Sequence, residues 1–136
     1  MSTPAIIVCT VNASCLEVMT ASLNAYVPRE VERYVHHKVG ANFGDAYNFA
    51  AREAFKRHDE ILICNDDIVF TPTTWSVLLA DVAHLRKVVP DLGYVATRSD
   101  YARGEQNVRS GRGKIDFLRY QSERHIVETP VIAPIC

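Results

Sequence analysis

The chain has 136 residues, of which 48% are hydrophobic and 23% are charged, and its formal net charge at pH 7 is −1. This length predicts one domain with a core of its own, and the composition excludes an intrinsically disordered chain. The balanced charge excludes nucleic-acid binding through a general basic field. We also expect no membrane span and no signal peptide, because no apolar run approaches roughly 18 residues and no basic stretch precedes the first one.

The four cysteines, Cys9, Cys15, Cys64 and Cys136, include no Cys-x-x-Cys pair, which argues against a zinc site. Cys9 and Cys64 lie inside apolar runs that are typical of buried strands. We therefore expect reduced, packed thiols in a cytoplasmic protein.

Strand-like and helix-like segments alternate from the start of the sequence. The continuous apolar run over 5–10 predicts a strand that is covered on both faces. An amphipathic helix follows: Ser14 and Glu17 have capping-box spacing at its start, and Pro28 ends it. The β-branched, roughly alternating stretch over 31–37 predicts a second strand.

The same alternation continues. A second helix is predicted over about 45–57, and 61–64 is the clearest buried strand in the sequence. Thr71, as an N-cap with Pro72 at the first helical position, opens a third helix, and 94–97 predicts another short strand. The apolar face of the second helix is predicted to hold Ala46, Tyr47, Ala50, Ala51 and Ala54. Strands separated by helices imply parallel crossovers, so we expect an α/β, mostly parallel sheet flanked by helices, in a single domain over 1–136.

The pattern changes near residue 97. Residues 97–114 hold five basic and two acidic side chains, three glycines and little apolar content, which is typical of a mobile, basic loop. Segments 115–120 and 125–131 are candidates for further strands, with prolines that place the second at an edge. The apolar run at the end of the sequence makes a homodimer plausible, with a second copy covering it.

The most informative motif is Asn65–Asp66–Asp67, directly after a strand. Ligands of open α/β sheets bind outside the carboxyl ends of the strands, and Mg²⁺ or Mn²⁺ commonly takes one or two carboxylates together with phosphate oxygens. Because Asp66 and Asp67 point to opposite sides if the strand continues, we expect one to bind the metal and the other to orient a donor or a sugar hydroxyl. The alternative is a turn closed by Asx hydrogen bonds.

A second feature is Thr10–Val11–Asn12 at the end of the first strand. Its backbone amides, the Thr10 hydroxyl and the Asn12 amide are candidates to hold a base or a ribose. The alternative is a strand-end turn that leads to the Ser14 cap.

A third feature is the helix start with Asn42 and Gly44, followed by Asn48 one turn later. Helix N-termini bind phosphate, although this one is neither a P-loop nor a Gly-x-Gly-x-x-Gly motif. The alternative is plain N-capping by Asn42. His37, at the end of the second strand, lies where a nucleobase edge is expected, unless it is simply a surface residue. Arg98 belongs to the basic segment, which either folds over a diphosphate or stays a solvated loop.

Taken in order, these motifs resemble those of family 2 glycosyltransferases of the GT-A fold. The resemblance extends over roughly 5–100 and weakens through 128–134. It implies that the first-strand loop and the Asn/Gly helix start hold the nucleotide of a sugar donor. It also implies that Asn65–Asp66–Asp67 occupies the family's Asp-x-Asp (DXD) motif, with Asn65 at the first acidic position. Asp67 then inherits the metal-ligand role for Mn²⁺ or Mg²⁺, and Asp66 a sugar or ribose contact.

The resemblance implies a metal-dependent hexosyltransferase that moves a sugar from a nucleoside diphosphate, with UDP as the expected carrier, to a glycan or other hydroxyl acceptor. Family members continue beyond the point where this sequence stops, and the catalytic base of the inverting members lies there. Asp100 is the favoured base among the remaining candidates, which are Glu105, Asp116, Glu123, His125 and Glu128.

Two alternatives stay open. One is a non-catalytic or relic nucleotide-sugar-binding module that needs a partner or a second copy to complete its site. The other is a nucleotidyltransferase, which is disfavoured because the loop over 10–14 has neither glycine nor a basic residue.

Overall fold

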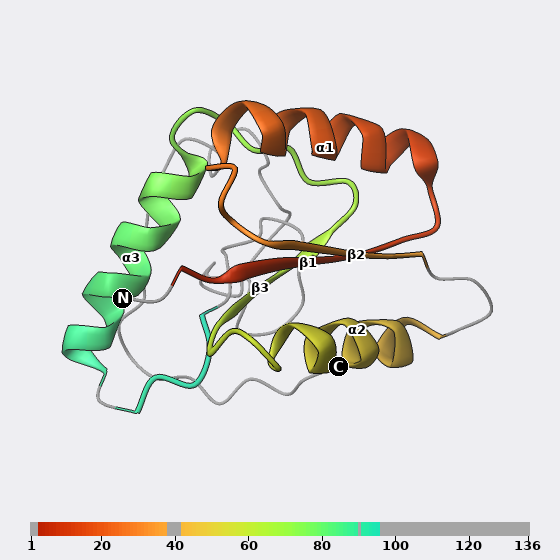
Figure 1. Cartoon of the computed structure of the whole chain (residues 1–136). Helices are drawn as coiled ribbons and strands as arrows, with labels where there is room; N and C mark the ends of the chain where they lie inside the picture. The colour runs from red at the N-terminus through yellow and green to blue at the C-terminus, as the bar shows by residue number, and fades with distance from the viewer. Residues whose placement is uncertain (1–2, 38–41, 90, 96–136) are drawn as a thin grey trace, which may run out of the picture. The chain divides into compact units, whose positions relative to one another are not determined.

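The computed structural model describes residues 3–37, 42–89 and 91–95. Its elements, in chain order, are β1 (Ala5–Thr10), α1 (Ala13–Tyr26), β2 (Arg33–His37), α2 (Phe43–Ala54), β3 (Ile61–Asn65) and α3 (Thr74–Val88). The three strands are parallel, in the order β2–β1–β3. This Rossmann-like βαβ arrangement confirms the predicted α/β class with a parallel sheet (Figure 1).

The contacts divide the chain into two compact units, with the boundary between Ser76 and Val77. The sheet, α1 and α2 belong to the first unit. A single domain over the whole chain therefore stays a prediction.

β1 lies at the centre of the sheet, and all six of its residues are buried, as the apolar run predicted. Its last residues pair with the ends of both neighbours: Thr10 lies opposite His37 of β2, and Cys9 lies opposite Asn65 of β3. Because parallel strands all end at the same edge, this register brings the strand-end residues singled out above to one edge of the sheet.

α1 and α2 cover opposite faces of the sheet (Figure 1). α1 buries Met19 and Leu23, and α2 buries the alanine face that its spacing predicted. The α2 core cluster consists of Ile7, Cys9, Ala46, Tyr47, Ala50 and Ala54, with Ala51 packed against it. Small side chains on this face let the helix backbone contact β1 and β2 closely.

The prediction that 61–64 is the clearest buried strand is wrong. Cys64 is buried, but Ile63 exposes 58% of its surface. The reason lies in the topology: within the described sheet, β3 has β1 as its only neighbour, and α2 packs mainly on β1 and β2. The apolar side chains of β3 alone do not reveal this edge position.

The start of one helix and one predicted strand also differ from expectation. α3 begins at Thr74 rather than behind Thr71, and the Thr71 N–H donates to Thr74 Oγ1 at 3.0 Å while the Thr74 N–H donates to the Thr71 carbonyl at 3.2 Å. Tyr94 and Val95 are not in a strand, and the remainder of the predicted strand over 94–97 lies outside the described residues. Within the described ranges, the helices lack the length and apolarity needed to cross a bilayer.

Candidate functional site

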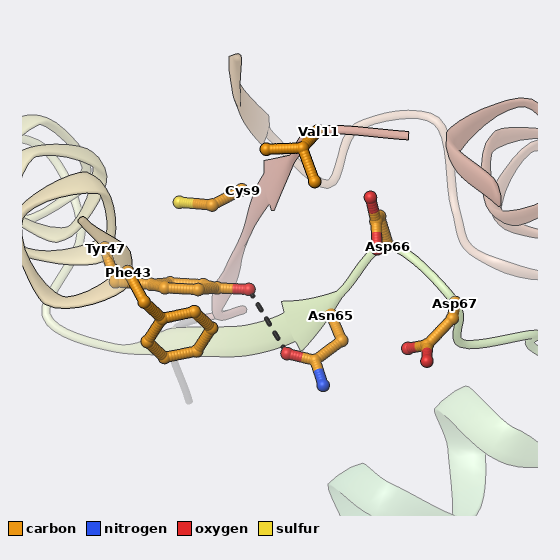
Figure 2. Close-up of a pocket in the computed structure, with 7 residues that line it drawn as sticks. All are labelled: Cys9, Val11, Phe43, Tyr47, Asn65, Asp66 and Asp67. Carbon is orange, nitrogen blue, oxygen red and sulfur yellow. Dashed lines mark hydrogen bonds between the residues drawn. The ribbon is translucent and has the colours of Figure 1, made fainter. Parts of the chain in front are cut away.

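A pocket of about 170 Å³ opens at the carboxyl edge of the sheet. Three segments of the first unit form it: the end of β1 with the loop that follows, the first turn of α2, and the end of β3 (Figure 2). The pocket is lined by Cys9, Val11, Phe43, Tyr47, Asn65, Asp66 and Asp67. Segments that are far apart in sequence therefore converge on one cavity, among them parts of the first-strand motif and of the acidic motif.

The Thr10 hydroxyl joins the first-strand motif to the acidic motif. Thr10 exposes only 3% of its surface, and its Oγ1 donates a 2.6 Å hydrogen bond to Asp66 Oδ2. The Asn12 backbone N–H in turn donates to Thr10 Oγ1 at 3.1 Å, which orients the hydroxyl toward the carboxylate. Hydrogen bonds to a charged acceptor are short and strong, so this contact holds Asp66 in one place.

The two carboxylates of the acidic turn point in different directions (Figure 2). Asp66 is half-buried and points toward the β1 loop, whereas Asp67 is exposed and points away from it. The described residues contain no cluster of three or more His, Cys, Asp or Glu side chains that would enclose a metal ion. This donor set fits a Mg²⁺ or Mn²⁺ ion that takes one or two carboxylates and completes its shell with phosphate oxygens and water.

Asn12 caps α1, so the predicted cap at Ser14 is wrong. Asn12 Oδ1 accepts hydrogen bonds from the backbone N–H groups of Ser14 at 3.1 Å and Cys15 at 3.3 Å. The side-chain oxygen at position 12 lies one residue before the helix, where it reaches the unpaired N–H groups, whereas Ser14 is already within the first turn. The side-chain oxygen of Asn12 is therefore engaged in the helix cap and is not directed toward a ligand.

Asn42 caps α2, as the N-capping alternative expected, and the helix begins at Phe43 rather than near Asp45. Asn42 Oδ1 accepts from the Asp45 N–H at 2.8 Å, and Asn42 Nδ2 donates to Asp45 Oδ2 at 2.6 Å. The Asp45 carboxylate therefore already occupies the electropositive start of α2. This arrangement weakens the case for a phosphate at the α2 N-terminus.

Three other predicted site residues, Gly44, Asn48 and His37, are described by the structure, and the rest lie outside the described residues. Gly44 is in the first turn of α2, where an added Cβ would meet Asn42 Oδ1 at an ordinary 3.5 Å, so the position does not require glycine. Asn48 and His37 are exposed and are not among the described residues that line the pocket. Arg98 and Asp100 lie outside the described residues, as do 97–114 and the later candidate strands and bases.

Phe43 and Tyr47 form an aromatic wall of the pocket that the sequence interpretation missed. Their rings lie one helical turn apart on α2, with centroids separated by 4.6 Å. The Tyr47 hydroxyl donates to the Cys64 carbonyl at 2.7 Å and lies 3.4 Å from Asn65 Oδ1. Burial raises the pKa of Tyr47 to about 12, so this hydroxyl is a donor at neutral pH. The signal in the sequence for this aromatic wall is the i, i+4 spacing of two aromatic residues at a helix start.

Comparison of the chain with protein-family models, with curated proteins and with solved structures finds no significant match in any of the three. The family 2 glycosyltransferase resemblance therefore stays a prediction.

Proposed function

We propose that this pocket binds a nucleoside-diphosphate sugar together with a divalent cation, and that the protein transfers the sugar to a hydroxyl acceptor as a glycosyltransferase. The observation that supports this most directly is the hydrogen bond between Thr10 and Asp66. It joins the strand-end loop expected to hold the nucleotide to the acidic turn expected to hold the cation. Both motifs also contribute side chains to the same pocket.

The positions of the two carboxylates suggest a division of roles. Asp67 is exposed in the pocket and is the proposed ligand of Mn²⁺ or Mg²⁺. Asp66 is anchored through Oδ2 to Thr10, and in the proposal its other oxygen accepts from a ribose or sugar hydroxyl. When bound, the cation would supply positive charge that offsets the charge developing on the leaving nucleoside diphosphate.

The acidity of the pocket makes the cation necessary to this proposal. A phosphate oxygen placed about 4 Å from either carboxylate would be repelled by roughly 1–4 kcal/mol, depending on how far water screens the pair. No basic side chain is among the described residues that line the pocket. A diphosphate is therefore expected to bind well only with a divalent cation between it and the turn.

The acceptor side of the reaction stays a prediction. Asp100 is the proposed base that takes the proton of the attacking hydroxyl, and it lies outside the described residues.

Isothermal titration calorimetry of the full chain with UDP tests the proposal. We expect binding in the presence of Mn²⁺, little binding in EDTA, and loss of most Mn²⁺-dependent binding in Asp67→Ala. Asp59→Ala is the matched control, because Asp59 is an exposed aspartate at the opposite end of β3. UDP binding that is equally strong in EDTA, or unchanged in Asp67→Ala, would contradict the proposal.

A second measurement separates an enzyme from a binding module. Release of UDP from UDP-sugars is measured with and without hydroxyl acceptors, in the wild type and in Asp67→Ala. Turnover that disappears in Asp67→Ala supports the transferase. Mn²⁺-dependent UDP binding without any turnover across donors and acceptors would instead favour the non-catalytic module.

A further inference from the structure

Phe43 is an exposed aromatic residue whose position in the pocket is not explained by the core. It leaves 60% of its surface exposed, although it is the first residue of α2 and lies beside the buried helix face. Its ring packs against the buried Tyr47 in a tilted arrangement, at a centroid distance of 4.6 Å and an interplanar angle of 51°. Phe43 is also among the residues that line the pocket (Figure 2).

Tyr47 gives Phe43 a rigid support. Its ring is buried in the α2 core cluster, and its hydroxyl is bonded to the backbone of β3 at 2.7 Å. An aromatic side chain that is backed by a fixed ring loses little conformational entropy when a planar ligand packs against it. Phe43 is therefore suited to stacking on a flat ring.

The size of the pocket limits what that ring can be. Its volume is about 170 Å³. An engineered apolar cavity of about 150 Å³ accommodates benzene, and the present volume is shared between the aromatic side and the acidic side, so one six-membered ring fits beside Phe43 better than two fused rings do. The wall beyond the aromatic pair is polar, and the exposed Asn65 carboxamide there offers a donor and an acceptor to the edge of a base.

We propose that Phe43 is a specificity-determining residue that stacks on a one-ring base and selects pyrimidine over purine nucleotides. This inference rests on the proposed function, because it assigns the base of the nucleotide to the aromatic side of the pocket and the diphosphate to the acidic side. Stacking of a base on an aromatic side chain is worth about 1–3 kcal/mol by alanine substitution, which corresponds to roughly 5-fold to 150-fold in affinity.

The test compares Phe43→Ala with Phe49→Ala. Phe49 is also on α2 and is similarly exposed, at 55%, but it packs against His36 and is not among the residues that line the pocket. With UDP and Mn²⁺, we expect Phe43→Ala to bind about 5-fold to 150-fold more weakly, and Phe49→Ala to stay within about 2-fold of the wild type. The wild type is expected to bind UDP and CDP more tightly than ADP and GDP, and this preference should shrink in Phe43→Ala.

Uridine and pyrophosphate, titrated separately, distinguish failure of this inference from failure of the proposed function. Uridine binding that is seen by ligand-observed NMR and lost in Phe43→Ala supports the stacking role even if UDP with Mn²⁺ shows no added affinity, a result that would remove only the proposed function. Pyrophosphate with Mn²⁺ should bind equally well to the wild type and to Phe43→Ala. Unchanged UDP and uridine binding in Phe43→Ala, equal affinity for purine nucleotides, or no uridine or UDP binding to the wild type would overturn the inference.

Discussion

The buried hydroxyl of Thr10 donates to Asp66 Oδ2 at 2.6 Å, across 56 positions of sequence. This contact fixes the acidic turn to the central strand of the sheet. It also determines which carboxylate stays exposed in the pocket, because Asp66 is held against β1 and Asp67 is not.

Replacing Thr10 by valine keeps the shape of the side chain and removes the donor to Asp66. We expect the free energy of unfolding to fall by about 1–3 kcal/mol, because a half-buried carboxylate loses a charge-assisted hydrogen bond. Urea denaturation at pH 7 measures the loss, and Thr10→Ser, which keeps the hydroxyl, should recover a large part of it. Equal stability of the valine and serine variants would show that the bond contributes nothing.

Replacing Asn12 by alanine removes the cap of α1. The backbone N–H groups of Ser14 and Cys15, which donate to Asn12 Oδ1, would lose their acceptor, at a cost of about 0.5–2 kcal/mol. Asn12→Asp and Asn12→Ser keep an oxygen at this position and should stay close to the wild type in thermal and urea unfolding. An alanine variant as stable as these two would contradict the capping role.

Replacing Tyr47 by phenylalanine leaves the buried Cys64 carbonyl without its 2.7 Å hydroxyl donor. We expect a loss of about 1–3 kcal/mol at pH 7, measured by urea denaturation. Tyr26→Phe is the control, since Tyr26 is an exposed tyrosine at the end of α1 and should change stability little.

The raised pKa of Tyr47 predicts how the difference in free energy of unfolding between the wild type and Tyr47→Phe depends on pH. Burial raises the pKa from an ordinary value of 10.0 to about 12, so the stabilisation by the protonated hydroxyl is complete below pH 10 and is lost as pH rises toward 12. The advantage of the wild type over Tyr47→Phe should therefore shrink between about pH 10 and pH 12. A constant or growing difference over this range would show that burial does not shift the ionisation.

The lowered pKa of Glu32 predicts that the protein loses stability in acid. The hydrogen bond of Glu32 to His58 Nε2 at 2.7 Å is the main cause that lowers this pKa below the ordinary 4.5, and the charge of Arg57, whose nearest nitrogen lies 2.8 Å away, acts in the same direction. A lowered carboxyl pKa stabilises the fold above the ordinary value, and the contribution disappears as pH falls through the lower, folded-state pKa.

The free energy of unfolding of Glu32→Gln should therefore fall less steeply than that of the wild type between pH 5 and pH 3. Glu53→Gln is the control, because Glu53 makes an exposed surface ion pair with Lys56, and such pairs contribute little. Parallel curves for the wild type and Glu32→Gln would rule out this origin of acid sensitivity.

The features that the local sequence predicted correctly are those in which apolar residues form a continuous run or recur at helical spacing. The apolar run of β1 predicts a strand buried on both faces, and the alanine spacing of α2 predicts the face that packs on the sheet. Because strands followed by helices return parallel to one another, the order of elements also predicts that the strand-end motifs share one edge. That expectation holds for Thr10, His37 and Asn65, which the strand register aligns.

Only the tertiary structure decided the features that depend on which segments become neighbours. β3 resembles a central strand in composition, but its place at the edge of the described sheet leaves Ile63 exposed. The bond from Thr10 to Asp66 and the pairing of Tyr47 with the β3 backbone join positions that are distant in sequence, so no local pattern encodes them. For the same reason Phe43 appears in sequence as one more apolar residue, and becomes a wall of the pocket only when α2 lies against the ends of β1 and β3.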